Sequence, residues 1–270
     1  MERPVLKDKK RIVIKVGTST LTYPNGKVNL NRIDKLARVL SDLKNMGKDV
    51  ILISSGAIGV GMGKLKIDER PHNTAERQAI AAVGQCELMQ MYSKFFSEYG
   101  QIVGQILLTR DVVDNDYSRT NVVNTFEKLL EKGIIPIVNE NDSVSIEELK
   151  SDHNNGFGDN DRLSAIVSTL IEADILIILT DIDGFYTKDP RNTPDAKPVR
   201  FISAITEDIE KSAGGVGSSR GTGGMITKIA AARIVLDNGI GMVLVNGQDP
   251  AVIYDVFEGR EVGTYFFDIH

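Results

Sequence analysis

A glycine-dense segment that carries one lysine is the strongest candidate for chemistry in this chain. Residues 221–224 read Gly-Thr-Gly-Gly and lead into a helix-like stretch that contains Lys228. Glycine lets the backbone approach a bulky anion closely, and the N–H groups at the start of a helix favour phosphate. Lys228 adds a full positive charge one turn into that helix. The segment therefore predicts a phosphate-binding site.

A second lysine, Lys15, stands in a comparable setting near the other end of the chain. Residues 11–16 read as a buried strand that ends in the small residues Gly17, Thr18 and Ser19. A sheet that brought Lys15 and Lys228 together would let them clamp the phosphates of a nucleotide. Neither segment matches a P-loop or a dinucleotide fingerprint, so a phosphate site of another design and a flexible surface loop both stay open.

The composition excludes several classes of protein. The chain has 270 residues, of which 41% are hydrophobic, and a net charge of −5, which suits a globular core and disfavours nucleic acid as a partner. Its apolar runs fall far short of the ~20 residues of a membrane span, and its first residues do not resemble a signal peptide. Because Cys86 is the only cysteine, we expect no disulfide, no zinc site and a cytoplasmic location.

Short apolar runs alternate with helical stretches along the chain. We expect strands at residues 11–16, 50–54, 103–108, 134–138, 175–180 and 242–246. Continuous Val, Ile and Leu runs are typical of strands that are buried on both faces of a parallel sheet. We expect helices near residues 30–46, 73–98, 119–132, 159–172, 223–238 and 249–257. This alternation predicts an α/β protein, a three-layer α/β/α open sandwich with a mainly parallel central sheet.

Glycines and small or polar residues mark the ends of these elements. A glycine stands just past four of the predicted helices, as C-terminal caps do: Gly47, Gly100, Gly133 and Gly239. Several strands end in small or polar residues, and ligands of such folds bind at the carboxyl ends of the strands. The turn-rich segment 182–220 looks like an insertion over that edge. No linker is evident, so we expect a single domain of residues 1–270 with two lobes.

Taken together, the motifs resemble the amino acid kinase family, and within it the members that act on glutamate. The matching segments follow the family's order over nearly the whole chain: residues 13–19, 54–58, 81–85, 104–109, 136–142, 158–161, 179–181, 186–191 and 221–228. The resemblance implies transfer of the γ-phosphoryl group of ATP to the side-chain carboxylate of L-glutamate, the first step of proline biosynthesis. Such a carboxylate is already ionised at neutral pH and needs no general base.

The resemblance also implies roles for single residues on the phosphate side. Lys15 and Lys228 would contact the phosphates and stabilise charge during transfer, and Asp161 would hold both lysines in place. Backbone N–H groups at Gly17 and Gly56 would donate to the transferring phosphoryl group. Plain structural roles also stay open for these residues. Lys15 could be an ordinary strand lysine, Lys228 a lysine on a helix surface and Asp161 an acid favoured at a helix N-terminus. Gly17 and Gly56 could simply form turns at the ends of strands.

On the acceptor side, the resemblance implies that Asp142 pairs with the α-ammonium of glutamate, while Ser55 and Asn160 bind its carboxylates. Thr180 and Asp181 would flank the adenosine, although Asp181 alone could be a turn residue. The remaining ATP-binding positions that the resemblance implies are Thr222, Gly223, Gly224, Met225, Ile226, Thr227 and Lys228. The acceptor side would come from about residues 1–170 and the ATP side from about 171–270. ATP would bring Mg²⁺, for which we expect no protein ligand.

Other readings of the same motifs stay open. A sibling kinase could act on N-acetylglutamate, aspartate or a nucleoside monophosphate, although Asp142 favours an acceptor with a free amine. A sensor without catalytic activity could use the same fold, although both lysines are present. The family implies a homo-oligomer, a dimer or a tetramer, and proline as a possible feedback inhibitor. We expect a short form that lacks the RNA-binding-like C-terminal domain of many members, with no nucleic-acid or membrane partner.

Overall fold

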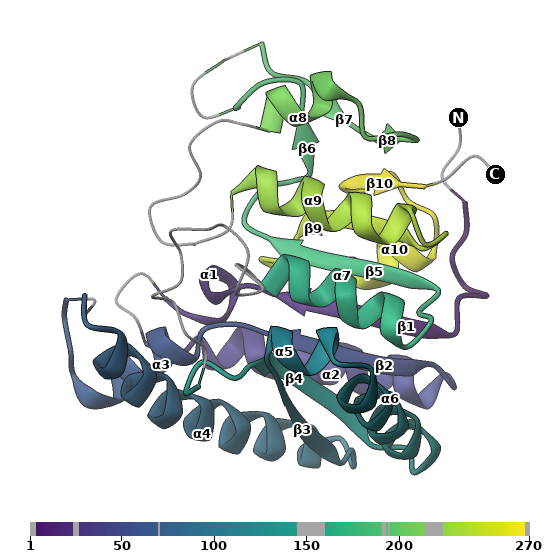
Figure 1. Ribbon diagram of the computed structural model, residues 1–270. Coiled ribbons are helices and arrows are strands. Elements are labelled where there is room, and N and C mark those ends of the chain that lie inside the picture. Colours follow the sequence, from purple (N-terminus) through teal and green to yellow (C-terminus); the bar gives the residue numbers. More distant parts are fainter. Residues whose placement is uncertain are drawn as a thin grey trace.

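An eight-stranded sheet runs through the centre of the molecule (Figure 1). The computed structural model describes residues 4–23, 27–69, 71–144, 160–190, 193, 195–213 and 224–267. The strands, in their order across the sheet, are β3 (Val103–Leu108), β4 (Ile135–Glu140), β2 (Asp49–Ser54), β1 (Arg11–Val16), β5 (Ile175–Thr180), β9 (Gly241–Asn246), β10 (Thr264–Phe266) and β8 (Phe201–Ile202). All neighbouring pairs are parallel except β9 and β10.

The six predicted strands all form, each within two residues of its predicted ends, and the predicted α/β class is confirmed. Burial explains why their apolar runs were so informative. Every residue of β5 is buried, and five of the six residues in β1 and in β2 are buried as well. Strands covered on both faces need apolar side chains at every position.

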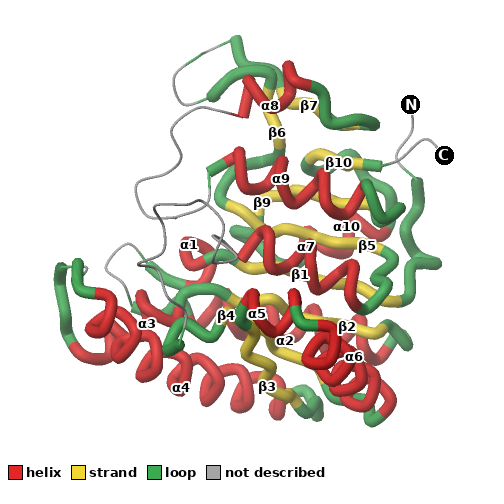
Figure 2. The backbone as a smooth tube through the Cα atoms, in the orientation of Figure 1, coloured by secondary structure: helices red, strands yellow, loops and turns green. Residues whose placement is uncertain are grey.

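The six predicted helices also form, and they cover both faces of the sheet (Figure 2). They are α2 (Leu30–Asn45), α4 (Thr74–Glu98), α6 (Asp116–Glu131), α7 (Asn160–Leu170), α9 (Met225–Leu236) and α10 (Val252–Phe257). Buried residues of α2, α4 and α10 share one core cluster, and those of α6, α7 and α9 share the other. The four predicted capping glycines have φ between +71° and +82°, the left-handed region that favours glycine.

Several short elements were not predicted. They are the helices α1 (Thr18–Leu21), α3 (Ala57–Leu65), α5 (Arg110–Asp114) and α8 (Glu207–Ala213), and the strands β6 (Phe185–Tyr186), β7 (Pro198–Val199), β8 and β10. Of the segment that we expected over the ligand edge, the described part adds β8 to the margin of the sheet and places α8 against α9 (Figure 1). In the described part of the chain, no helix has the length and apolar character of a membrane span.

Helix α3 was not predicted, because glycine has a low helix propensity and this segment contains several glycines. It still forms a helix because two glycines, one in α3 and one in α4, allow the two helices to pack closely. A Cβ on Gly84 of α4 would lie 1.8 Å from the carbonyl oxygen of Ala57, and one on Gly61 of α3 would lie 2.1 Å from that of Ile80. The backbones of α3 and α4 therefore touch, and no larger residue fits at either point of contact. This contact fixes α3 against the long helix α4.

Replacing Gly84 by alanine should disrupt this contact. We expect Gly84→Ala to lower the free energy of unfolding by about 2–3 kcal/mol, because the added methyl group must push two backbones apart. Urea unfolding of the purified protein measures the change. The matched control is Gly59→Ala in α3, where the nearest atom to the new Cβ would be Thr18 Cγ2 at 3.4 Å. That variant should be as stable as the wild type or up to about 1 kcal/mol more stable, and an equal loss in both variants would contradict the packing argument.

Candidate active site

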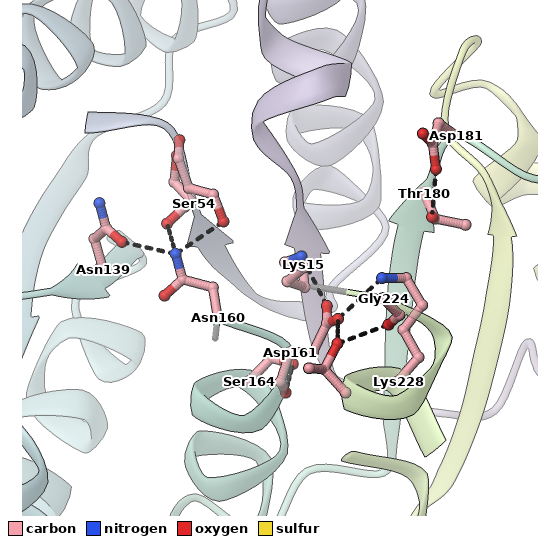
Figure 3. Close-up of polar contacts among 12 residues, drawn as sticks. Lys15, Ser54, Asn139, Asn160, Asp161, Ser164, Thr180, Asp181, Gly224 and Lys228 are labelled. Carbon is pink, nitrogen blue, oxygen red and sulfur yellow. Dashed lines mark hydrogen bonds and ion pairs between the residues drawn. The ribbon is translucent and has the colours of Figure 1, made fainter. Parts of the chain in front are cut away.

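Lys15, Asp161 and Lys228 meet at the carboxyl edge of the sheet (Figure 3). The Asp161 carboxylate pairs through Oδ1 with Lys15 Nζ at 2.7 Å and through Oδ2 with Lys228 Nζ at 3.0 Å. All three residues are buried, with exposed fractions of 6% for Lys15, 0% for Asp161 and 7% for Lys228. The predicted meeting of the two lysines is therefore observed, with one carboxylate between them.

Three separate elements deliver these side chains. Lys15 lies in β1 between Ile14 and Val16, whose side chains point to the opposite face, so its own side chain points towards α7 and α9. Asp161 lies in the first turn of α7, and Lys228 lies one turn into α9. The ammonium groups of the lysines therefore meet the carboxylate between the sheet and the two helices.

Thr227 adds a further contact to the same carboxylate. Its hydroxyl oxygen lies 2.9 Å from Asp161 Oδ2 and 2.8 Å from the carbonyl oxygen of Gly224, so either oxygen can accept its proton. Gly224 is the N-cap of α9 and has no side chain with which to cap it. The start of this helix is thus tied directly to Asp161, and its first N–H groups have no partner within the helix.

The electrostatics of this group follow from burial and charge. Burial alone would raise the pKa of Asp161, because it disfavours the charged form. The ammonium groups of Lys15 and Lys228 outweigh burial and hold the pKa well below the ordinary aspartate value, so Asp161 is ionised at neutral pH. Two ammonium groups and one carboxylate together carry one net positive charge at a buried position, which suits a phosphate ligand.

Asn160, the residue before Asp161, reaches a second polar group on the other side of β1 (Figure 3). Its Nδ2 donates to Ser55 Oγ at 2.8 Å, to Asn139 Oδ1 at 3.1 Å and to the carbonyl oxygen of Ser54 at 3.3 Å. Ser54 ends β2, Ser55 follows it, and Asn139 lies one residue before the end of β4. The predicted acceptor residues Ser55 and Asn160 therefore lie in direct contact.

The orientation of the Asn160 amide is fixed by its surroundings. The Ser54 carbonyl oxygen can only accept, and Asn139 Oδ1 is identified as an oxygen because the backbone N–H of Glu140 donates to it at 2.9 Å. Asn160 must therefore present its N–H₂ group to both. Its Oδ1 is buried and accepts no hydrogen bond within the described part of the chain. A buried acceptor of this kind requires a donor from a ligand, from water or from the part of the chain outside the described residues.

The other predicted site residues lie along the same edge. Gly17 follows β1, and a Cβ there would lie 3.6 Å from Lys15 Nζ. Gly56, with φ of +97°, is the N-cap of α3. Asp142 follows β4 in a partly exposed turn. Thr180 ends β5 and its Oγ1 donates to Asp181 Oδ1 at 3.2 Å.

The predicted ATP-binding positions that remain lie at or before the start of α9. Met225 and Ile226 form the first turn of that helix, and Ile226 is 56% exposed. Thr222 and Gly223 lie outside the described residues.

Comparison with known proteins decides the family. The sequence model described as "Amino acid kinase family" matches residues 10–246. The chain belongs to this family. Proteins named glutamate 5-kinase are 60% identical to it over 264 residues in Clostridium perfringens, 59% identical in Listeria innocua and 55% identical in Enterococcus faecalis. Each alignment covers 98% of this chain and 95–97% of the relative. The resemblance that the motifs predicted is thereby confirmed.

Solved structures show the same amino acid kinase fold at much lower sequence identity. UMP kinase from Bacillus anthracis aligns with a TM-score of 0.65 at 19% identity, over 97% of both chains. Isopentenyl phosphate kinase from T. acidophilum aligns with a TM-score of 0.64 at 20% identity, over 95% of this chain and all of the other. At such identities the likeness shows the fold alone, and the predicted architecture is confirmed.

The buried ion pairs predict a pH-dependent contribution to stability. Asp161→Asn should lower the free energy of unfolding by about 3–5 kcal/mol at pH 7, because two buried ammonium groups lose their carboxylate. The folded-state pKa of Asp161 lies below its unfolded value, so the contribution is present above the unfolded pKa and is lost as the pH falls through the folded pKa. Urea unfolding should show a constant gap between wild type and variant from about pH 5 to 7, and a shrinking gap below about pH 4.

A carboxylate at the same edge provides the control for this measurement. Asp181 is exposed, and Asp181→Asn removes the same charge without leaving a buried cation. We expect that variant to stay within about 0.5 kcal/mol of the wild type. A gap for Asp161→Asn that stayed constant below pH 4 would contradict the ion-pair argument.

Proposed function

We propose that the chain catalyses the ATP-dependent phosphorylation of the side-chain carboxylate of L-glutamate to γ-glutamyl phosphate, the first step of proline biosynthesis. The observation that carries this proposal is the buried Asp161 carboxylate held between Lys15 and Lys228 at the carboxyl edge of the sheet. The relatives named glutamate 5-kinase, at 55–60% identity over nearly the whole chain, support L-glutamate as the acceptor. We propose that residues 1–170 supply most of the acceptor side and residues 171–270 most of the ATP side.

Lys15 and Lys228 are proposed to act on the transferring phosphoryl group. In the transfer, a carboxylate oxygen of glutamate bonds to the γ-phosphorus while the bond to the bridging β–γ oxygen breaks and ADP leaves. Charge spreads over the γ-phosphoryl oxygens in the transition state, so catalysis depends on positioned positive groups rather than on a base. Asp161 contacts both lysines and is proposed to fix the distance between them.

Backbone N–H groups are proposed to supply further donors. The first N–H groups of α3 have no partner within their helix, and Gly56, the N-cap, offers no side chain to satisfy them. Gly17 lies beside the Lys15 ammonium group. The two glycine turns lie close to each other, since a Cβ on Gly56 would contact Thr18 at 3.4 Å. This arrangement favours an anion between β1 and α3.

The acceptor side suggests how each end of glutamate is recognised. The Asn160 N–H₂ group already donates to protein oxygens, and its buried Oδ1 can only accept. We therefore propose that Asn160 receives the α-ammonium group, together with Asp142, rather than a carboxylate as the sequence led us to expect. Ser55 Oγ accepts from Asn160, so its own proton can go to a carboxylate of glutamate.

The ATP side is proposed to use Thr180 and Asp181 near the adenosine and residues 222–228 around the phosphates. The described residues contain no group of three or more His, Cys, Asp or Glu side chains that could hold a metal ion. Magnesium keeps most of its ligands as water and phosphate when it enters with a nucleotide. We therefore propose that Mg²⁺ arrives with ATP and assign it no protein ligand.

Two further proposals rest on the family alone. Inhibition by proline would regulate the first step of its own biosynthesis, and a homodimer or homotetramer would match the assembly expected of the family. No described contact bears on either of them.

Hydroxamate formation tests the proposed reaction directly. Hydroxylamine traps an acyl phosphate, so the purified chain with Mg²⁺ and ATP should give hydroxamate from L-glutamate. N-acetyl-L-glutamate should give little product, because acetylation removes the positive charge that Asn160 and Asp142 are proposed to bind. L-aspartate, one methylene shorter, should also give little product. Stronger activity with either alternative acceptor would contradict the proposal and assign the chain to another reaction of the same family.

The two lysines should be essential for turnover but not for folding. We expect Lys15→Ala and Lys228→Ala each to lower kcat by about 100-fold or more, because each removes a charge that acts in the transition state. Steady-state kinetics measures the loss, and circular dichroism checks the fold. Lys128→Ala is the control, since Lys128 is a surface lysine paired with Glu131 on α6. Near-normal turnover in both active-site variants would contradict the proposed roles.

A further inference from the structure

Gln85 on α4 contacts the proposed acceptor residues through Asn139, and it has no part in the reaction proposed above. Its Oε1 accepts a hydrogen bond from Asn139 Nδ2 at 2.8 Å. Asn139 is buried, with 2% of its surface exposed, and its Oδ1 accepts from Asn160. We propose that Gln85 is a positioning residue that sets the preference for an acceptor with a free α-ammonium group, acting through Asn139 and Asn160. This inference rests on the proposed function.

The direction of every hydrogen bond in this chain of amides is determined. The Glu140 backbone N–H can only donate, so the atom of Asn139 that it meets is an oxygen. The other end of the Asn139 amide is then its N–H₂ group, which requires an acceptor from Gln85. Asn160 in turn must donate to Asn139 Oδ1, which leaves Asn160 Oδ1 as an acceptor that no described residue uses and that is proposed to meet the ligand.

Helix α4 holds Gln85 in a fixed place. The neighbouring residue, Gly84, is the point where the backbone of α4 touches that of α3 at Ala57. Two turns further along the same helix, the hydroxyl of Tyr92 lies 2.8 Å from Ser54 Oγ, where it is fully buried. The helix is therefore anchored to α3 and β2 on either side of Gln85, so the backbone that carries Gln85 has a fixed position relative to the site.

Loss of the Gln85 acceptor would leave a buried N–H₂ group of Asn139 without a partner. A buried donor in that state is costly, and rotation of the side chain to find another acceptor relieves the cost. Rotation of Asn139 removes one of the three acceptors that orient Asn160, and leaves Ser55 Oγ and the Ser54 carbonyl oxygen. Asn160 Oδ1 is then held less firmly towards the α-ammonium group, whereas Lys15, Lys228 and Asp161 keep their contacts.

The test compares Gln85→Met with Gln90→Met, the same substitution at an exposed position of α4. Glutarate, which is glutamate without its amino group, serves as a competitive inhibitor. We expect Gln85→Met to raise KM for L-glutamate about tenfold, the loss typical of one hydrogen bond to a charged group. Its kcat should stay within about twofold of the wild type and its Ki for glutarate should not change. Gln90→Met should match the wild type in all three constants.

Other outcomes would overturn the inference. A parallel rise in KM and Ki would mean general damage to the pocket, and unchanged constants would mean that Gln85 does not position the site. The double variant with Asn139→Ala should resemble Asn139→Ala alone, and a further tenfold loss would show that Gln85 acts by another route. Gln85→Glu keeps an acceptor oxygen, so a tenfold fall in its preference for L-glutamate over glutarate would also count against the inference.

Two measurements distinguish a failure of the proposed function from a failure of this inference. The wild-type hydroxamate assay decides whether L-glutamate is phosphorylated, before any variant is compared. The shift in Tm that L-glutamate produces measures binding without turnover. It should be larger than the shift with glutarate in the wild type and in Gln90→Met, and the difference between the two shifts should become smaller in Gln85→Met. An unchanged difference in Gln85→Met would overturn the inference even if turnover were absent.

Discussion

The contact of one buried carboxylate with two buried ammonium groups constrains the whole structure. Asp161 pairs with Lys15 from β1 and Lys228 from α9, and the cost of burying three charges is offset only if all three are held in place. The order of the sheet, with β1 between β2 and β5, puts Lys15 near its centre. Helices α7 and α9 pack side by side on that face and complete the group.

Two consecutive residues of α7 divide the work of the site. Successive side chains of a helix diverge by about 100°, so Asn160 and Asp161 point in different directions. Asp161 faces the lysines, whereas Asn160 faces the ends of β2 and β4. The first turn of α7 therefore fixes the distance between these two groups of contacts, and the proposed in-line transfer requires such a fixed distance.

The sequence predicted the structure best where the pattern of neighbouring residues alone determines the local structure. Continuous apolar runs identified the central strands, and Lys15 could be assigned to the ligand edge because it lies close to the end of such a run. The sequence pattern did not predict the structure where contacts with residues distant in the sequence determine it. Helix α3 has the glycine content of a loop and is a helix because Gly61 and Gly84 let two backbones touch. The direction of the Asn160 amide depends on the Ser54 carbonyl oxygen and on Asn139, which no spacing in the sequence relates to it.

Helix α4 shows how a distant element can decide chemistry without touching the reacting atoms. Its glycine contact sets the position of α3, whose first turn follows Gly56, and its polar side chains reach β2 through Tyr92 and β4 through Gln85. The contacts of Lys15 and Lys228 with Asp161 depend instead on β1, α7 and α9. The proposed acceptor side and the proposed phosphate side are thus supported by separate sets of elements that join at the start of α7. Under the proposed function, a change confined to α4 alters acceptor binding while Lys15, Asp161 and Lys228 keep their contacts.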